Sequence, residues 1–202
     1  MKKSLLAIAC AVVLTACKKN ETTTNEMSTD SAEMSMPADS AMMGDSATVS
    51  GNTMQSATLN DQDRNFAMEA AKSGMTEVMH GQAATTNGTN AKVKSFGEMM
   101  VRDHTKANDE LKSLATAAGL TLPTAPDASQ QRMHDDLKAK TGADFDKAFA
   151  EMMVTDHQKA VDLFKKQSAD GSDPALKQFA DKTLPTLEQH LAQSKELRDA
   201  LK

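Results

Sequence analysis

An internal repeat carries the side chains that are best suited to chemistry. The segments 96–109 and 149–162 are identical at ten of 14 aligned positions, and each contains an Asp-His pair. The pairs are Asp103-His104 and Asp156-His157. Imidazole nitrogens and carboxylate oxygens are ligands for transition metals, and they also hydrogen-bond to one another. The repeat therefore predicts either a metal site or a polar layer inside the protein.

Two further polar residues are predicted to point toward the same core. Glu77 lies within a helical stripe that also contains Phe66 and Ala70, and His190 shares a helical face with Leu187. Charged groups that point inward are tolerated when they are paired or bound to a metal. Each of the four long helices predicted below thus brings at least one candidate ligand toward the core.

A helical projection predicts how the two Asp-His pairs face. With about 100° between successive residues, Asp103 falls near the centre of an apolar stripe and His104 lies on its flank. Asp156 and His157 are expected to repeat this arrangement. The projection therefore places the carboxylates further inward than the imidazoles.

Three interpretations of these residues are open. In the first, a transition metal (Fe, Zn or Mn) is bound in the core and is released when the histidines are protonated, at about pH 5–6. Its candidate ligands or their hydrogen-bond partners are Glu77, Asp103, His104, Asp156, His157 and His190. In the second, the same residues form a metal-free layer in an envelope interaction or stress-protection module. In the third, which is less favoured, the i,i+4 pairs Met100–His104 and Met153–His157 bind copper.

Helices must position these residues, and no segment has the pattern of a strand. Gly, Asn-Gly and Asp-Pro signals mark the ends of the predicted elements, and Pro185 is expected to kink the last helix. The sequence predicts long helices over 60–86, 90–118, 143–168 and 174–201, with a short helix over about 127–140.

The lengths of the connections predict the topology. The first and last connections are short, so each joins an antiparallel helix pair, whereas residues 119–142 separate the second and third long helices. A connection of this length can cross the bundle, as it does in ferritin-like folds. We therefore predict an all-α, ferritin-like four-helix bundle whose long crossover carries the short helix. If the crossover makes the second and third long helices parallel, the two Asp-His pairs lie at the same height.

The N-terminus predicts export and lipidation. Residues 1–16 combine two lysines with an apolar run that is too short to span a bilayer as a permanent helix. The run ends in Leu-Thr-Ala-Cys17, which resembles the bacterial lipobox, so residues 1–16 are expected to be removed and Cys17 to carry lipid, including palmitate. Because Lys18 rather than Asp follows, the pattern favours the outer membrane, with the protein facing the periplasm. Residues 17–57 are expected to form a disordered Ser/Thr/Met-rich tether, and residues 58–202 the domain.

Composition excludes several function classes. The chain has 202 residues, a net charge of −5 and neither Trp nor Tyr. A nucleic-acid partner is not expected, because such binding needs a basic surface and usually aromatic side chains for stacking. Both cysteines lie within residues 1–17, so a thiol nucleophile is not expected in the domain. The sequence predicts no catalytic residues and names no protein partner; the membrane, through the lipid on Cys17, is the expected partner.

The chain resembles a family of bacterial envelope proteins, the domain of unknown function 4142, over about residues 58–202. The resemblance rests on Met-Val-Arg-Asp-His-Thr-Lys at 100–106, Asp-His-Gln-Lys-Ala-Val at 156–161 and Lys-Thr-Leu-Pro-Thr-Leu-Glu-Gln-His-Leu at 182–191. It implies an exported, sometimes lipidated, ferritin-like bundle and supplies no activity. Neither copy of the repeat has the Glu-x-x-His spacing of ferritin-like di-iron sites, so an oxidase is the least favoured function.

Overall fold

The computed structural model describes residues 59–202, and in this part of the chain it contains five helices and no strand. The helices are α1 (Asp61–Asn87), α2 (Ala91–Ala117), α3 (Ala128–Lys138), α4 (Gly142–Asp170) and α5 (Pro174–Ala200). Their ends agree with the predicted ends to within two residues. The predicted signal peptide, the lipidated Cys17 and the whole of the predicted tether lie outside the described residues. Among residues 59–202, no helix is long and apolar enough to cross a membrane.

Short polar side chains explain where the helices begin. Asn60, Asn90, Asp127 and Asp173 each accept a hydrogen bond from a backbone N–H of the first turn, which satisfies a donor that has no partner within the helix. Gly119 adopts a φ of 70° directly after α2, a conformation that favours glycine. The boundaries are therefore encoded locally.

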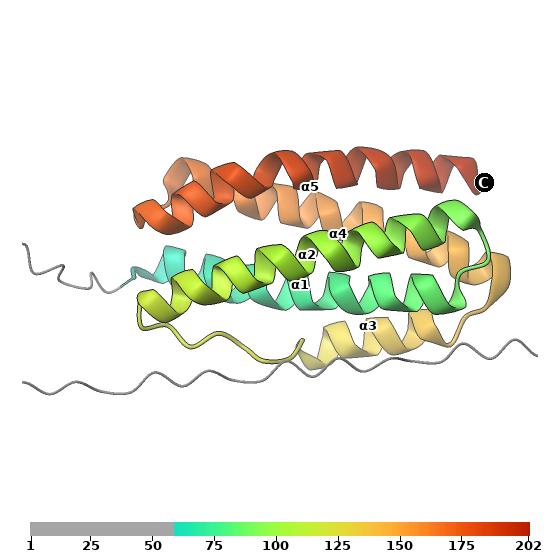
Figure 1. Ribbon diagram of the computed structural model, residues 1–202, viewed down its shortest axis with the longest axis horizontal. Helices are drawn as coiled ribbons and strands as arrows, with labels where there is room; N and C mark the ends of the chain where they lie inside the picture. The colour runs from blue at the N-terminus through green and yellow to red at the C-terminus, as the bar shows by residue number, and fades with distance from the viewer. Residues whose placement is uncertain (1–58) are drawn as a thin grey trace, which may run out of the picture. The chain divides into compact units, whose positions relative to one another are not determined.

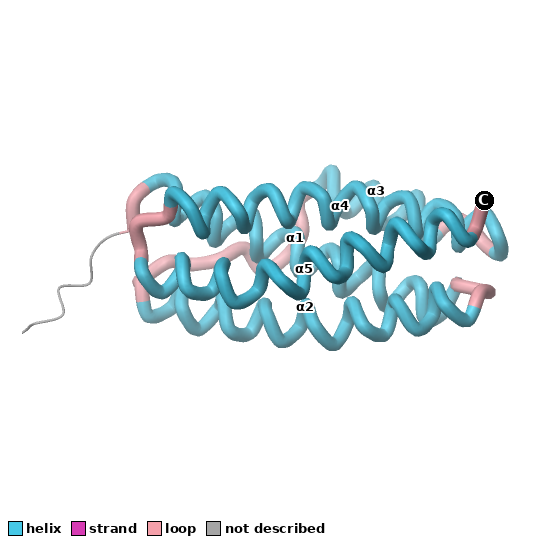
Figure 2. Tube along the Cα trace, turned by 90° about the horizontal axis from the view of Figure 1, so that it is seen from above, coloured by secondary structure: helices cyan, strands magenta, loops and turns pink. Residues whose placement is uncertain are grey.

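The five helices form a bundle with one long crossover. Figure 1 shows α1 beside α2 and α4 beside α5, each pair antiparallel, while α2 and α4 run in the same direction. The helix α3 lies along the crossover and contacts α1 and α4 (Figure 2). The predicted all-α bundle with a helix in its crossover is thus confirmed. Pro185 lies inside α5, which continues through it as one helix, as the predicted range of this helix requires.

A polar layer divides the core of the bundle into two apolar clusters. One cluster contains Phe66 and Leu111, and the other contains Phe96 and Phe149. Along α1, α2 and α4, buried polar side chains lie between the residues of the first cluster and those of the second. These side chains are Glu77, His80, His104 and His157, and His190 of α5 joins them. The layer is therefore enclosed by apolar packing above and below.

Two glycines allow α1 and α2 to approach closely beside this layer. A Cβ atom added to Gly97 would lie 2.7 Å from the Cβ of Ala84 and 2.7 Å from the carbonyl oxygen of Gly81. Both distances are shorter than atoms of folded proteins tolerate, and one neighbour is backbone that cannot rotate away. The position therefore requires glycine for packing rather than for its backbone freedom.

We expect Gly97→Ala to destabilise the protein by about 1–3 kcal/mol, the usual effect of overpacking a core. In a helix interior alanine is more stabilising than glycine by about 1 kcal/mol. A loss of stability in this variant must therefore come from the forced separation of α1 and α2. Urea unfolding followed by circular dichroism measures the change, with exposed Ser95→Ala on the same helix as the control. A Gly97→Ala variant more stable than the parent would contradict the close approach.

Candidate metal centre

Four helices each contribute one buried polar side chain to the centre of the layer. Glu77 comes from α1, His104 from α2, His157 from α4 and His190 from α5, and each is at least 95% buried. The parallel course of α2 and α4 brings the two copies of the repeat to the same height. The ring centroids of His104 and His157 are accordingly only 5.5 Å apart. The predicted convergence of these four residues is therefore observed.

The two aspartates of the repeat lie further outward than the projection predicted. The side chains of Asp103 and Asp156 remain 25% and 19% exposed, whereas His104 and His157 are buried. The projection was wrong because it took Ala107 as a core residue, and Ala107 is only partly buried. The inward face of α2 is centred on Met100, His104 and Leu111 instead. The imidazoles thus occupy the centre and the carboxylates its edge.

The three histidines form a compact set of possible ligands. One ligand atom from each of His104, His157 and His190 can be chosen so that all three lie within 4.8 Å of one another. The ring centroid of His190 lies 5.4 Å from that of His104 and 5.3 Å from that of His157. Within residues 59–202, this is the single group of three or more His, Cys, Asp or Glu side chains with that geometry.

Each imidazole has one ring nitrogen engaged and the other one free. Nδ1 of His157 lies 2.9 Å from the carbonyl oxygen of Met153, and Nε2 of His190 lies 3.1 Å from Oδ2 of Asp103. Nδ1 of His104 lies 3.1 Å from Oε2 of Glu77. The other nitrogens are buried and have no hydrogen-bond partner, namely Nε2 of His104, Nε2 of His157 and Nδ1 of His190. Metal-binding histidines usually have this pattern, in which the distal nitrogen fixes the orientation of the ring.

The two carboxylates beside the histidines have different roles. Oε1 of Glu77 is buried without a hydrogen-bond partner and lies 3.6 Å from Nε2 of His157, so this oxygen can serve as a fourth ligand. Asp103 orients His190 and also pairs with the exposed guanidinium of Arg102 at 2.8 Å. Asp103 therefore orients a candidate ligand, and its own oxygens are already engaged.

Asp156 lies beside His80, a histidine that is not among the predicted ligands. Its Oδ2 is 3.8 Å from Nδ1 of His80, a fully buried side chain of α1. His80 stacks on His134 of α3 with 5.6 Å between the ring centroids. The i,i+3 spacing of Glu77 and His80 places both on one helical face and was the available signal for His80. Nothing in the sequence connected His134 to this position, because the contact depends on how the crossover folds back.

Burial keeps the histidines neutral. It lowers the pKa of His104 well below the usual value of 6.5, and it lowers the pKa of His157 to about 4. The pKa of His190 is also lowered by burial, although Asp103 opposes the change. Burial raises the pKa of Glu77 well above 4.5, and the charge of Asp156 acts in the same direction. Neutral imidazole is the form that binds metals, so at neutral pH the three rings need no deprotonation.

The donor set fits a divalent transition metal. Three neutral imidazoles and one carboxylate make four ligands, which is the coordination number of most protein zinc sites. Imidazole also suits Fe²⁺, and the mixture of nitrogen and oxygen donors favours these borderline ions over Cu⁺, which prefers thiolates and thioethers.

We expect acid to release a bound metal from these buried histidines at a lower pH than from exposed histidines of ordinary pKa. The unfolded chain takes up a proton at His157 as the pH falls through 6.5, whereas the folded protein does so at about 4. The metal-free protein therefore loses stability between these two values. The raised pKa of Glu77 partly offsets this loss, since the folded state holds that proton more tightly than the unfolded state.

The measurement is metal content after dialysis at about pH 6 and about pH 4, alongside thermal unfolding of the metal-free protein. Metal should be retained at the higher pH and lost at the lower one. Complete release at about pH 6 would show that the ligands are solvent-exposed imidazoles rather than these buried rings.

Comparison with known proteins supports the fold. No curated protein matches the chain. A fragment of a DUF305 protein from Deinococcus radiodurans, solved as a crystal structure, superimposes with a TM-score of 0.61 at 11% identity. The match covers 70% of this chain and 98% of the fragment, and at this identity it shows the fold alone. The family model named "Domain of unknown function (DUF4142)" matches residues 48–197, and the chain therefore belongs to the DUF4142 family.

Proposed function

We propose that this protein binds a divalent transition metal, zinc or iron(II), in the core of its helical bundle. The ligands are His104, His157 and His190, with Glu77 as the fourth. One observation carries the proposal: each of three buried imidazoles keeps one nitrogen without a partner, and the three rings face a common centre. Asp103 and the carbonyl oxygen of Met153 hold two of the rings in place for binding.

The same observation argues against a metal-free structural layer. A polar layer that stabilises a fold by itself satisfies its own donors and acceptors, because each buried group left without a partner costs about 1–3 kcal/mol. His104, His157 and His190 each leave one nitrogen without a partner, Glu77 leaves one oxygen, and His80 leaves both nitrogens. A cation bound by the three imidazoles gives their free nitrogens a partner, and Oε1 of Glu77 lies 3.6 Å from one of these nitrogens, Nε2 of His157.

Elemental analysis of the protein tests the proposal. The full chain is purified without chelators or an oligohistidine tag and analysed for Fe, Zn, Mn and Cu, both as isolated and after incubation with each metal. We expect about one equivalent of a single metal that survives gel filtration. A protein that is isolated without metal and binds none of the four ions would contradict the proposal and indicate that the layer has a structural role only.

We propose in addition that the protein is an envelope lipoprotein, held at the outer membrane by lipid on Cys17. The support is the sequence of residues 1–17 alone. Metabolic labelling with a radioactive palmitate tests it, since label should enter the parent protein and not the Cys17→Ser variant. Equal labelling of both proteins, or of neither, would refute the lipid anchor.

A further inference from the structure

We propose that the metal reaches the histidines from one side of the bundle, through a pocket between α1, α3 and α4, and that Asp156 receives it there. The inference rests on the metal-binding function proposed above. It adds an assignment for Asp156, whose carboxylate is not part of the ligand set, and for the histidine beside it.

The pocket has a volume of about 350 Å³ and reaches the candidate ligand Glu77. Its walls come from α1, from the beginning of α3 and from α4. The carboxylates that line it belong to Glu69, Glu77, Asp127 and Asp156. Glu77 is 97% buried and its Oε1 has no hydrogen-bond partner, so an unsatisfied oxygen lies at the inner end of the pocket.

A small internal cavity continues from this pocket toward the histidines. The cavity has a volume of about 20 Å³, which suffices for one water molecule, and His104 lines it. Glu77 and Ser73 line both the cavity and the pocket. The Glu77 side chain therefore lies between the pocket and the cavity that His104 lines.

Asp156 is the carboxylate of the pocket that is available to an incoming cation. Glu69 is paired with Lys72, and Asp127 caps α3 by accepting from the backbone of Ser129. Asp156 makes no such bond, and its nearest partner is Nδ1 of His80 at 3.8 Å. Both nitrogens of that fully buried ring lack a partner. Asp156 thus offers a carboxylate oxygen to a divalent ion in the pocket, and the imidazole of His80 lies behind it, buried and outside the pocket lining.

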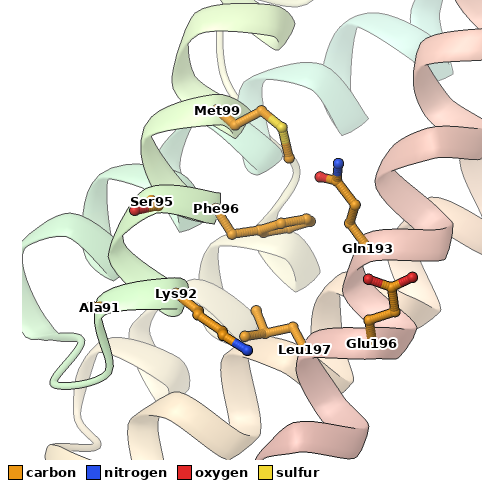
Figure 3. Close-up of a pocket in the computed structure, with 8 residues that line it drawn as sticks. All are labelled: Ala91, Lys92, Ser95, Phe96, Met99, Gln193, Glu196 and Leu197. Atoms are coloured by element: carbon orange, nitrogen blue, oxygen red, sulfur yellow. The ribbon is translucent and has the colours of Figure 1, made fainter.

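On the opposite side of the bundle, the path to the histidines is blocked by an aromatic ring. A larger pocket of about 480 Å³ lies between α2 and α5, and Figure 3 shows the ring of Phe96 projecting across it from α2 toward α5. The same ring packs edge-on against His157 and His190 at 6.3 and 6.4 Å between centroids. The carboxylate of Glu196 lines this pocket, but the ring of Phe96 lines it as well and packs against two of the histidines, so an apolar ring covers the histidines on that side.

Cobalt uptake by the full chain, purified in detergent, tests the route. The protein has neither Trp nor Tyr, so the visible absorption of Co²⁺ bound to nitrogen ligands is the direct optical signal. We expect Asp156→Asn to slow uptake about tenfold, which corresponds to about 1.4 kcal/mol in the barrier, with the final equivalents unchanged. Asp156→Glu should restore much of the rate, because it keeps a carboxylate in the pocket.

A charge reversal gives the opposite change without touching buried groups. Lys159 lines the proposed pocket and Lys92 lines the pocket on the other side, and both are exposed. Lys159→Glu should accelerate uptake, and the acceleration should shrink as salt screens the field. Lys92→Glu is the matched control and should leave the rate unchanged.

Each outcome decides one of the two proposals. Parent-like rates for both Asp156→Asn and Lys159→Glu, or equal effects of Lys159→Glu and Lys92→Glu, would overturn the route while leaving the metal site intact. A parent protein that takes up no cobalt, or takes up as much when His104 and His157 are both replaced, would overturn the metal site and the route with it. Slower uptake with fewer final equivalents in Asp156→Asn would make Asp156 a ligand, contrary to the proposal.

Discussion

The double substitution His104→Gln/His157→Gln is expected to abolish metal binding. It removes two of three imidazoles, and glutamine offers a weakly coordinating amide oxygen in their place. Loss of a hydrogen-bonding partner of a ligand already lowers metal affinity by about 10–100-fold, so loss of two ligands should lower it by more than about 100-fold. The loss should be complete in elemental analysis.

Calorimetric titration with zinc measures this effect, and His134→Gln is the matched control. His134 is also a buried histidine, but it lies on α3 outside the group of three. The control should bind one equivalent with parent affinity. Zinc at 1,000 times its dissociation constant should stabilise the parent by about 4 kcal/mol and leave the double variant unchanged. Undiminished binding by the double variant would place the metal elsewhere in the chain.

Glu77→Gln is expected to weaken metal binding about 10–100-fold without weakening the metal-free fold. The amide keeps the shape of the side chain and can still accept from Nδ1 of His104, which now lies 3.1 Å from Oε2. It removes the anionic oxygen that faces Nε2 of His157. Burial already raises the pKa of Glu77 well above 4.5, so the charged form is disfavoured in the metal-free protein and a neutral replacement relieves that penalty.

This substitution separates the two interpretations of the polar layer, since they predict opposite changes in stability. If the layer binds metal, the metal-free Glu77→Gln protein unfolds at the parent temperature or above it, while its zinc affinity falls. If the layer is structural, the carboxylate is needed for the fold, and the variant unfolds at a lower temperature. Glu98→Gln, at an exposed position of α2, controls for loss of one negative charge.

The position of the layer explains why function and stability can be in conflict here. The two apolar clusters on either side hold α1, α2, α4 and α5 at fixed separations, so the rings of the layer cannot collapse onto one another to satisfy their free nitrogens. The packing thus preserves a set of unpartnered imidazole nitrogens at a cost to the stability of the protein. Functional sites commonly carry such local costs, which the remaining fold offsets.

The sequence by itself determined the helices and their order. Caps such as Asn60 and Asp173 act within one turn, and the apolar period is local, so both can be read without knowledge of the fold. The repeat of 96–109 in 149–162 also identified His104 and His157 as equivalent, and the long crossover implied that they would meet. Export and the lipid on Cys17 are predictions of the sequence as well, and they concern residues outside the described part.

Only the tertiary structure decided which member of each Asp-His pair points inward. Adjacent residues of a helix differ by about 100° in direction, and the direction of the core depends on where two neighbouring helices pack. The contacts of Asp156 with His80, and of His80 with His134, likewise depend on how the crossover lays α3 against α1 and α4. These are contacts between residues far apart in the chain, and no local pattern encodes them, which is why the grouping of the three histidines became visible only once the helices were packed.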